Sequence, residues 1–261
     1  MKLLKLGPEE LERYDRQLRI SGWDEEKQEK LKSATVLIAG VGGLGCSAAV
    51  YLAVAGVGNI VLVDRSKVER SNLNRQILYH DNDIGKNKVD AAVKRLSLLN
   101  PAIKVRGFDV EIIEENAEKI INGCDVVVDG MDNIATRLIL NKFCYQLNIP
   151  FVHAAVYGLE SRLMTIIPGK TSCLQCFSTS VQPETGPFPV LGAAVGLIAC
   201  LQAMEVVKLI TCFGETSGGN LILIDGEFMG FQALSIQQDE NCPVCGKSMR
   251  LSKGNSKRYN F

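Results

Sequence analysis

Apolar residues along this chain occur in short runs that alternate with longer stretches of helical spacing, the pattern of an α/β fold. The first run, residues 35–39, is rich in β-branched side chains and carries no charge, which predicts a buried parallel strand. Small and apolar residues continue at helical density over 46–55, and a second buried strand is expected at 59–63. The rest of the chain is organised around this strand–helix–strand unit.

The same alternation continues toward the C-terminus without a Gly/Ser-rich linker that would divide the chain. Further strands are expected at 103–108, 124–128, 151–156, 162–167, 221–225 and 228–235. Helices are expected over 89–99, 111–121, 134–147 and 192–210, the last with Gln202, Glu205 and Lys208 on a polar edge. We predict one Rossmann-like nucleotide-binding domain over 1–261, with a mainly parallel sheet extended by further strands. An N-terminal helical arm is expected over 8–31 and a flexible tail over 247–261.

A glycine-rich turn joins the first strand to its helix, and an acid follows the second strand. Glycines let the backbone turn tightly and approach a phosphate, while the helix N-terminus offers free N–H groups and the positive end of its dipole. An acid at the end of the second strand can accept hydrogen bonds from ribose hydroxyls. These features predict an adenine nucleotide bound by Gly40, Gly42, Gly43, Gly45 and Asp64.

Cations follow the second strand, at the edge where open parallel sheets place their ligands. Arg75, Lys86 and Lys88 lie there, close to Asn72. A nicotinamide dinucleotide has two bridging phosphates and needs few cations, whereas a triphosphate carries about four charges and needs Arg and Lys clamps. The cations favour ATP, and an NAD-dependent oxidoreductase remains the alternative within the enzymes.

Two aspartates, Asp129 and Asp132, follow the expected strand at 124–128 on the same ligand side. An acid there can hold the Mg²⁺ that accompanies ATP, or it can cap the next helix. We favour Asp132 for the metal. Neither histidine, His80 or His153, has a visible partner in the sequence, and we interpret both as structural.

Charge and hydropathy exclude some classes of partner. The chain has 29 basic and 29 acidic residues, and this zero net charge argues against a nucleic-acid-binding surface. The longest apolar run, 190–201, is too short to span a bilayer, which predicts a buried helix and no membrane partner. Since Pro8, Glu9 and Glu10 interrupt the N-terminus before any apolar leader, we expect a cytoplasmic protein.

Two Cys-x-x-Cys pairs indicate a metal site. Four thiolates can close the tetrahedral coordination sphere of a structural zinc ion, and the long separation of the pairs predicts a clasp that ties the C-terminal end to the body. An iron–sulfur cluster or a redox pair is the weaker interpretation. The predicted zinc ligands are Cys173, Cys176, Cys242 and Cys245.

These motifs together resemble the MoeB/ThiF/HesA family of ubiquitin-activating-like adenylyltransferases, over residues 13–245. The segments that carry the resemblance are RYDRQ at 13–17, GVGGLG at 40–45, SNLNRQ at 71–76, GKNKVDAA at 85–92, GMDN at 130–133, LQAMEVVK at 201–208 and the two cysteine pairs. The resemblance implies ATP-dependent adenylation of the C-terminal carboxylate of a small ubiquitin-like sulfur carrier that ends in Gly-Gly.

The resemblance also implies residue roles. Asp64 would bind the ribose, Asn72, Arg75 and Lys88 the phosphates, and Asp132 the Mg²⁺. Arg16 would reach the ATP of the neighbouring subunit in a homodimer. A carboxylate is already a nucleophile, so catalysis can rest on positioning and charge neutralisation without a general base.

One departure from the family is visible. Several members carry a cysteine after the first zinc pair for a thioester or persulfide step, but residues 177–199 contain none. We therefore expect the enzyme to stop at the adenylate and a separate protein to donate sulfur. Adenylation of a peptide or a tRNA, and a zinc-stabilised nucleotide-sensing scaffold, remain alternatives. The sequence does not identify the carrier or the pathway, which could be molybdopterin synthesis, thiamine synthesis, tRNA thiolation or protein conjugation.

Overall fold

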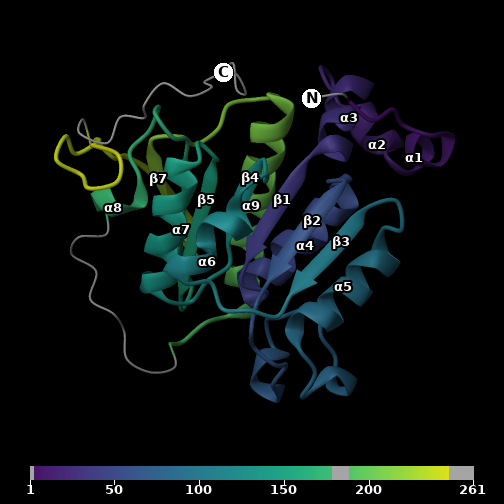
Figure 1. Cartoon of the computed structure of the whole chain (residues 1–261), viewed down its shortest axis with the longest axis horizontal. Helices are drawn as coiled ribbons and strands as arrows, with labels where there is room; N and C mark the ends of the chain where they lie inside the picture. The colour runs from purple at the N-terminus through teal and green to yellow at the C-terminus, as the bar shows by residue number, and fades with distance from the viewer. Residues whose placement is uncertain (1–2, 178–187, 247–261) are drawn as a thin grey trace.

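A computed structural model describes residues 3–177 and 188–246 of the chain (Figure 1). Its centre is an eight-stranded sheet in the order β3-β2-β1-β4-β5-β6-β7-β8. The strands from β3 to β5 pair in parallel, and β6, β7 and β8 extend the sheet in antiparallel pairs. The predicted Rossmann-like α/β class with a mainly parallel, extended sheet is confirmed. The tail expected at 247–261 lies outside the described residues.

The strands lie close to the ranges predicted for them. Their bounds are β1 Thr35–Ala39, β2 Asn59–Val63, β3 Lys104–Phe108, β4 Val126–Asp129, β5 Phe151–Tyr157, β6 Glu160–Ile166, β7 Asn220–Asp225 and β8 Gly230–Ser235. The helices are α1 Pro8–Arg13, α2 Asp15–Leu18, α3 Glu25–Ser33, α4 Gly43–Ala55, α5 Lys88–Leu99, α6 Glu114–Ile121, α7 Ile134–Gln146, α8 Leu174–Phe177 and α9 Gly192–Thr211. Short 3₁₀ turns occupy Arg70–Asn72 and Asp81–Asp83.

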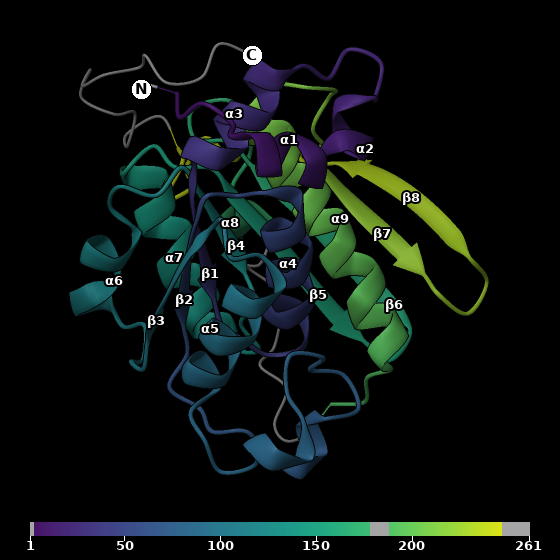
Figure 2. The same ribbon diagram turned by 90° about the vertical axis from the view of Figure 1, so that its right-hand side faces the viewer.

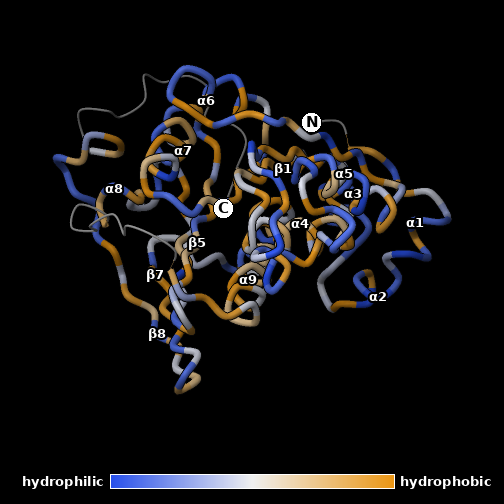
Figure 3. The backbone as a smooth tube through the Cα atoms, turned by 90° about the horizontal axis from the view of Figure 1, so that it is seen from below, coloured by the Kyte–Doolittle hydropathy of each residue, from blue (hydrophilic) through white to orange (hydrophobic). Residues whose placement is uncertain are grey.

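Helices cover both faces of the parallel part of the sheet. Alternate side chains of β1 enter different cores: Val36 and Ile38 pack with α4 and α9, while Leu37 and Ala39 pack with α6 and α7. This two-sided burial explains why β1 reads as a continuous apolar run. Seen from below, the hydrophobic segments concentrate between the layer of α4 and α9 and the layer of α6 and α7 (Figure 3).

The N-terminal arm is more divided and more buried than a single solvated helix. Three helices, α1, α2 and α3, lie at the end of the sheet where β1 begins (Figures 1 and 2). Tyr14, between α1 and α2, is buried, and its hydroxyl accepts a hydrogen bond from Asn100 Nδ2 at 3.0 Å. Gln28 is also buried and donates to the carbonyl of Ala55 at 2.8 Å. These contacts attach the arm to the ends of α4 and α5.

The helix α9 matches the range predicted for it, 192–210, to within one residue. By length and composition it could cross a membrane, but half of its most apolar stretch is buried against the sheet and α4, as in the core helix of a folded domain. Two residues of the expected polar edge face inward, because Gln202 and Glu205 are buried. Gln202 donates to the carbonyls of Asp129 and Val152, near the last paired residues of β4 and β5, and so links α9 to both strands.

Candidate nucleotide site and cysteine cluster

A pocket lies at the carboxyl ends of β1, β2 and β4, where the strand order switches direction. From β1 the chain runs outward through β2 and β3, then crosses back to place β4 on the other side of β1. Open α/β sheets bind ligands at such a point. Of the residues expected to bind nucleotide, phosphate or metal, the pocket is lined by Gly40, Gly42, Gly43, Asp64, Arg75, Lys88 and Asp132.

Close packing of two turns explains some of the glycines. Gly40 has a φ of +87°, and a Cβ there would lie 2.6 Å from the carbonyl oxygen of Gly130. A Cβ on Gly130 would lie 2.3 Å from the oxygen of Gly40, so the glycine turn and the acidic turn touch through their backbones. A Cβ on Gly45 would lie 1.9 Å from the same Gly40 oxygen, and Gly45 packs beneath the pocket without lining it.

Gly42 differs from these glycines. It lines the pocket, and a Cβ built on it would meet no protein atom closer than 3.9 Å. Its φ of −83° is open to any residue. Protein packing therefore does not require a glycine here, and the space beside Gly42, at the N-cap of α4, is available to a ligand. This is the geometry expected of a phosphate approaching a helix N-terminus.

Asp64 is held in a fixed orientation at the end of β2. Its Oδ2 accepts from the backbone N–H of Val41 at 2.8 Å, and its Oδ1 accepts from the N–H of Ser66 at 2.7 Å. The side chain is half-buried and still borders the pocket. Each carboxylate oxygen keeps further acceptor capacity, as binding to ribose hydroxyls requires.

Two of the four cationic residues that line the pocket, Arg75 and Lys88, have no acidic partner among the described residues. Lys88, at the start of α5, is 8% exposed, and neither it nor Arg75 forms an ion pair within residues 3–177 and 188–246. The side-chain Nη1 of Arg75 donates to the carbonyl of Ser71 and to Asn74 Oδ1, at 2.8 and 2.9 Å. Because a buried ammonium without a counter-charge is costly, this pair predicts an anionic ligand.

Besides Gly45, two of the sequence-predicted nucleotide-site residues lie outside the pocket. Asn72 is buried, accepts from the N–H of Glu69, and offers its carbonyl to the N–H groups of Arg75 and Gln76. It thereby shapes the loop that carries Arg75. Arg16 lies on α2, at the opposite end of the sheet, with 93% of its side chain exposed. A single chain does not bring Arg16 to its own pocket.

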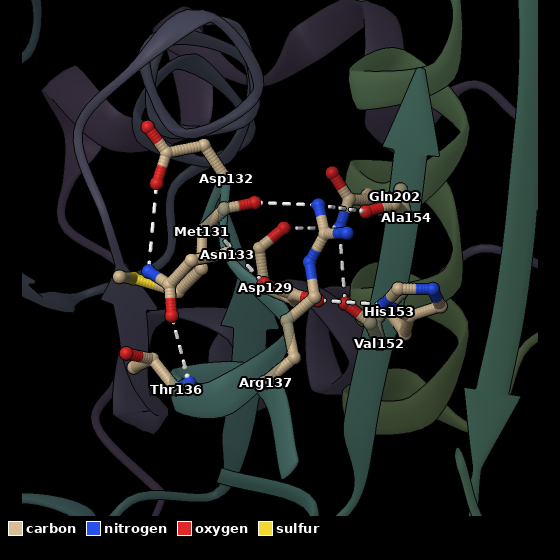
Figure 4. A network of polar contacts seen from close by, with 10 residues as sticks. All are labelled: Asp129, Met131, Asp132, Asn133, Thr136, Arg137, Val152, His153, Ala154 and Gln202. Atoms are coloured by element: carbon tan, nitrogen blue, oxygen red, sulfur yellow. Dashed lines mark hydrogen bonds and ion pairs between the residues drawn. The ribbon is translucent and has the colours of Figure 1, made fainter. Parts of the chain in front are cut away.

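The structure distinguishes the two aspartates clearly (Figure 4). Asp129 is fully buried and already satisfied, with His153 Nδ1 at 2.6 Å, the N–H of Met131 at 2.9 Å and Arg137 Nε at 3.4 Å. Asp132 is exposed on the pocket wall, and its one described contact is a 3.5 Å approach by Asn133 Nδ2. Asn133 caps α7, accepting from Thr136 N–H at 2.9 Å. Asp132 is thus the carboxylate that is free to hold a metal ion.

His153 is a satisfied buried histidine, as the sequence suggested, and its partner is Asp129. Burial lowers the pKa of His153, while the hydrogen bond and charge of Asp129 act in the opposite direction. The net lowering keeps the imidazole neutral near pH 7, and the Nδ1–H then donates to the carboxylate.

The sequence analysis assigned no role to Arg137, which lies beside Asp129 and lines the pocket. Arg137 lines the pocket from α7, and its Nη2 donates to the carbonyls of Met131 and Ala154 at 2.5 and 3.4 Å. Its place one turn into α7, directly after the GMDN segment, was the available signal. The apolar part of the pocket lining includes Val156, Phe188, Val190 and Val195, and these residues form no motif in the sequence.

The four predicted zinc ligands converge. Cys173, Cys176, Cys242 and Cys245 place their sulfur atoms within 4.8 Å of one another. The Sγ–Sγ distances are 3.6 Å for Cys173–Cys242 and 3.3 Å for Cys176–Cys245, close to the roughly 3.8 Å edge of a tetrahedral thiolate site with 2.3 Å zinc–sulfur bonds. Burial raises the pKa of Cys173 and Cys245, which a bound cation would counteract. The donor set fits zinc.

Comparison with known proteins agrees with this geometry. The model of the ThiF family matches residues 14–244. Protein HesA, heterocyst, of Trichormus variabilis is 40% identical, with 97% of this chain and 96% of the relative covered. The SAMP-activating enzyme E1 of Haloferax volcanii is 38% identical, with 94% and 92% covered. The adenylyltransferase and sulfurtransferase MOCS3 of Anopheles gambiae is also 38% identical, with 96% of this chain but 58% of the relative covered.

Among solved structures, E. coli MccB with MccA-N7isoASN matches with a TM-score of 0.82 and 27% identity, covering 90% of this chain and 75% of that one. The expected class of adenylating enzyme is confirmed by these relatives, and the resemblance drawn from the motifs is confirmed with it. The chain belongs to the ThiF family.

Proposed function

We propose that this enzyme uses ATP and Mg²⁺ to adenylate the C-terminal carboxylate of a small ubiquitin-like sulfur-carrier protein. The observation that carries the proposal is the pair of unpaired cations, Arg75 and Lys88, beside the glycine turn and the free carboxylate of Asp132 in one pocket. A relative named as the E1 that activates SAMP supports a protein acceptor.

Each of the pocket residues has its own role in this reaction. Asp64 binds the ribose, and the N-terminus of α4 at Gly42 and Gly43 receives the phosphates. Asp132 holds the Mg²⁺, which would neutralise charge on the phosphate oxygens. A carboxylate oxygen of the carrier attacks the α-phosphorus, the bond to the bridging oxygen breaks, and pyrophosphate leaves with the electron pair. Arg75 and Lys88 stabilise the negative charge that builds up on the leaving group.

A homodimer completes the site in this proposal. The outer faces of α4 and α9 carry exposed apolar side chains, among them Tyr51, Leu197 and Met204 at 50, 38 and 53% exposure. In Figure 2 these helices share a face with α2. The pocket lies at the carboxyl ends of β1, β2 and β4, whereas α2, which carries Arg16, lies at the end of the sheet where β1 begins. A two-fold axis lying across that face would bring Arg16 to the pocket of the partner.

The cysteine cluster has a structural role in the proposed function, and the sulfur comes from elsewhere. The thiolates of the cysteine cluster hold a structural zinc ion and leave no open position for catalysis. Since residues 177–199 contain no cysteine, a separate protein supplies sulfur after adenylation, in the cytoplasm. A covalent, thiol-sensitive conjugate between enzyme and carrier would contradict this part.

The test is carrier-dependent exchange of labelled pyrophosphate into ATP, with candidate proteins ending in Gly-Gly added one at a time. Exchange with one of them, lost in Asp132→Ala, supports the proposal and identifies the carrier. A peptide acceptor is the second candidate, because MccB was crystallised with a form of MccA. Exchange with short peptides but with no folded carrier would favour that function. ATP binding without any exchange would favour a nucleotide-sensing scaffold.

A further inference from the structure

The residue before Asp132 is clamped through both of its backbone polar atoms. The N–H of Met131 donates to Asp129 Oδ1 at 2.9 Å, and the carbonyl of Met131 accepts from Arg137 Nη2 at 2.5 Å. The two side chains come from different elements, β4 and α7. The peptide leading into Asp132 is therefore fixed between a strand and a helix (Figure 4).

Asp129, which holds one side of this clamp, is itself held. It is 0% exposed, and its Oδ2 contacts His153 Nδ1 at 2.6 Å and Arg137 Nε at 3.4 Å. Its backbone carbonyl accepts from Gln202 Nε2 at 3.0 Å. A buried carboxylate needs such partners to remain charged in place. His153 and Arg137 both contact Asp129, which accepts from the Met131 N–H, and so they help to hold the Met131 backbone.

The Asp132 side chain has no comparable support of its own. Among the described residues, its carboxylate is approached only by Asn133 Nδ2, at 3.5 Å. Its position relative to the glycine turn is consequently set by the backbone of the turn, which contacts Gly40 through Gly130. Metal affinity depends strongly on groups that orient a ligand without touching the metal.

We propose that Arg137 and His153 are positioning residues that act through Asp129 and Met131 to fix the Asp132 carboxylate for its metal ion. This inference rests on the proposed function, in which Asp132 binds Mg²⁺ with ATP. Arg137 and His153 touch neither the metal nor the reacting atoms in this account.

Metal binding can be measured without turnover. The probe is Mn²⁺, followed by electron paramagnetic resonance, in the presence of the intact protein and the α,β-methylene analogue of ATP, whose α,β bond is not cleaved. We expect Arg137→Gln and His153→Val to raise the Mn²⁺ dissociation constant about tenfold, the range for groups that support metal ligands. The affinity of the analogue without metal should change less than twofold.

Conservative variants separate positioning from general stability. Asn places an amide N–H near the position of the histidine Nδ1, so His153→Asn should restore Mn²⁺ affinity to near the wild-type value. Arg137→Lys keeps a cation beside Asp129 but loses the Nη2 hydrogen bond to the carbonyl of Met131. Its Mn²⁺ dissociation constant should therefore lie between those of the wild type and Arg137→Gln. Leu140→Ala, a core truncation on the same helix, should lower the unfolding temperature and leave Mn²⁺ affinity unchanged.

Two outcomes would overturn the inference. One is wild-type Mn²⁺ affinity in Arg137→Gln and His153→Val while Asp132→Ala weakens it. The other is an equal loss in Leu140→Ala, which would show that stability alone is responsible. If Asp132→Ala itself leaves Mn²⁺ affinity unchanged, the metal assignment of the proposed function fails instead, and the two failures are distinguishable.

Discussion

The nucleotide pocket and the cysteine cluster both gather side chains from distant parts of the sequence, but they differ in how those side chains are satisfied. In the pocket, Lys88 and Arg75 have no acidic partners among the described residues and Asp132 faces open space. In the cluster, four sulfur atoms converge on one another and leave no ligand position open. Unsatisfied groups mark the place of chemistry, whereas a closed ligand set indicates a structural role.

The largest effect should follow from removing a pocket cation. Lys88→Met keeps most of the aliphatic stem and loses the charge that, in the proposed function, stabilises the departing pyrophosphate. We expect carrier-dependent exchange to fall about 100-fold or more, the range for one electrostatic donor. The thermal midpoint should be unchanged or higher, because a buried unpaired cation is removed. A loss of exchange accompanied by unfolding would contradict the expectation that Lys88 acts in catalysis and not in stability.

The cysteine cluster should show the opposite behaviour. Cys242→Ser removes a thiolate from the closed set, and we expect the free energy of unfolding to fall by about 4 kcal/mol or more, as for other lost metal sites. Exchange per folded molecule should stay within twofold. Chemical denaturation and zinc analysis by mass spectrometry provide the measurement. Wild-type stability in the variant, or a zinc-free wild-type protein of full stability, would contradict a structural zinc.

The glycines allow a sharper version of the comparison. Gly42→Ala adds a methyl group that meets no protein atom closer than 3.9 Å, so stability should be unchanged while ATP affinity falls about tenfold or more. Gly40→Ala should lower both the stability and the ATP affinity, because its Cβ would lie 2.6 Å from the Gly130 oxygen.

Gly123→Ala is the matched control for Gly40→Ala. Its φ is +85° with nothing within 4 Å, so only a backbone strain of about 1–2 kcal/mol applies and ATP affinity should be unaffected. Unfolding curves and calorimetric titration with ATP give both quantities. Equal ATP affinities for Gly42→Ala and Gly123→Ala would show that the pocket at α4 does not receive the phosphates.

The smallest effect concerns pH. Because burial lowers the pKa of His153 in the fold, the unfolded chain takes up a proton at higher pH than the folded one. This contribution to stability is complete above the unfolded pKa of 6.5 and is lost as the pH falls below it. His153→Asn should flatten the stability profile between about pH 6.5 and 5, above the range where carboxylates titrate. An unchanged profile would contradict a neutral buried imidazole.

The sequence predicted most of the fold, and several of the residues that it selected as candidates line one pocket. Apolar runs such as 59–63 matched their strands because burial on both faces leaves a strong periodic signal. The glycine turn and Asp64 were placed correctly in the pocket because spacing alone sets where a strand–turn–helix unit presents its backbone. The cysteine pairs were found because thiol spacing is distinctive.

What the sequence did not predict depends on contacts between distant segments. Gln202 looked like a surface residue of a polar edge, but it bonds the carbonyls of Asp129 and Val152 inside the fold. The sequence analysis assigned no role to Arg137, because its contacts with Asp129 and Met131 depend on how α7 packs beside the end of β4. The sequence analysis favoured Asp132 over Asp129 for the metal, but the physical reason is that Asp129 is buried and held by His153 and Arg137, which spacing does not reveal.

The most direct test of the central claim is to trap the activated carboxylate. The enzyme, ATP, Mg²⁺ and the cognate carrier would be incubated with hydroxylamine, and the carrier analysed by intact and fragment mass spectrometry. We predict a hydroxamate on the C-terminal glycine, with AMP released, and no such product with Lys88→Met or without ATP. Release of ADP, or modification of the carrier at any other position, would contradict carboxylate adenylation by this pocket.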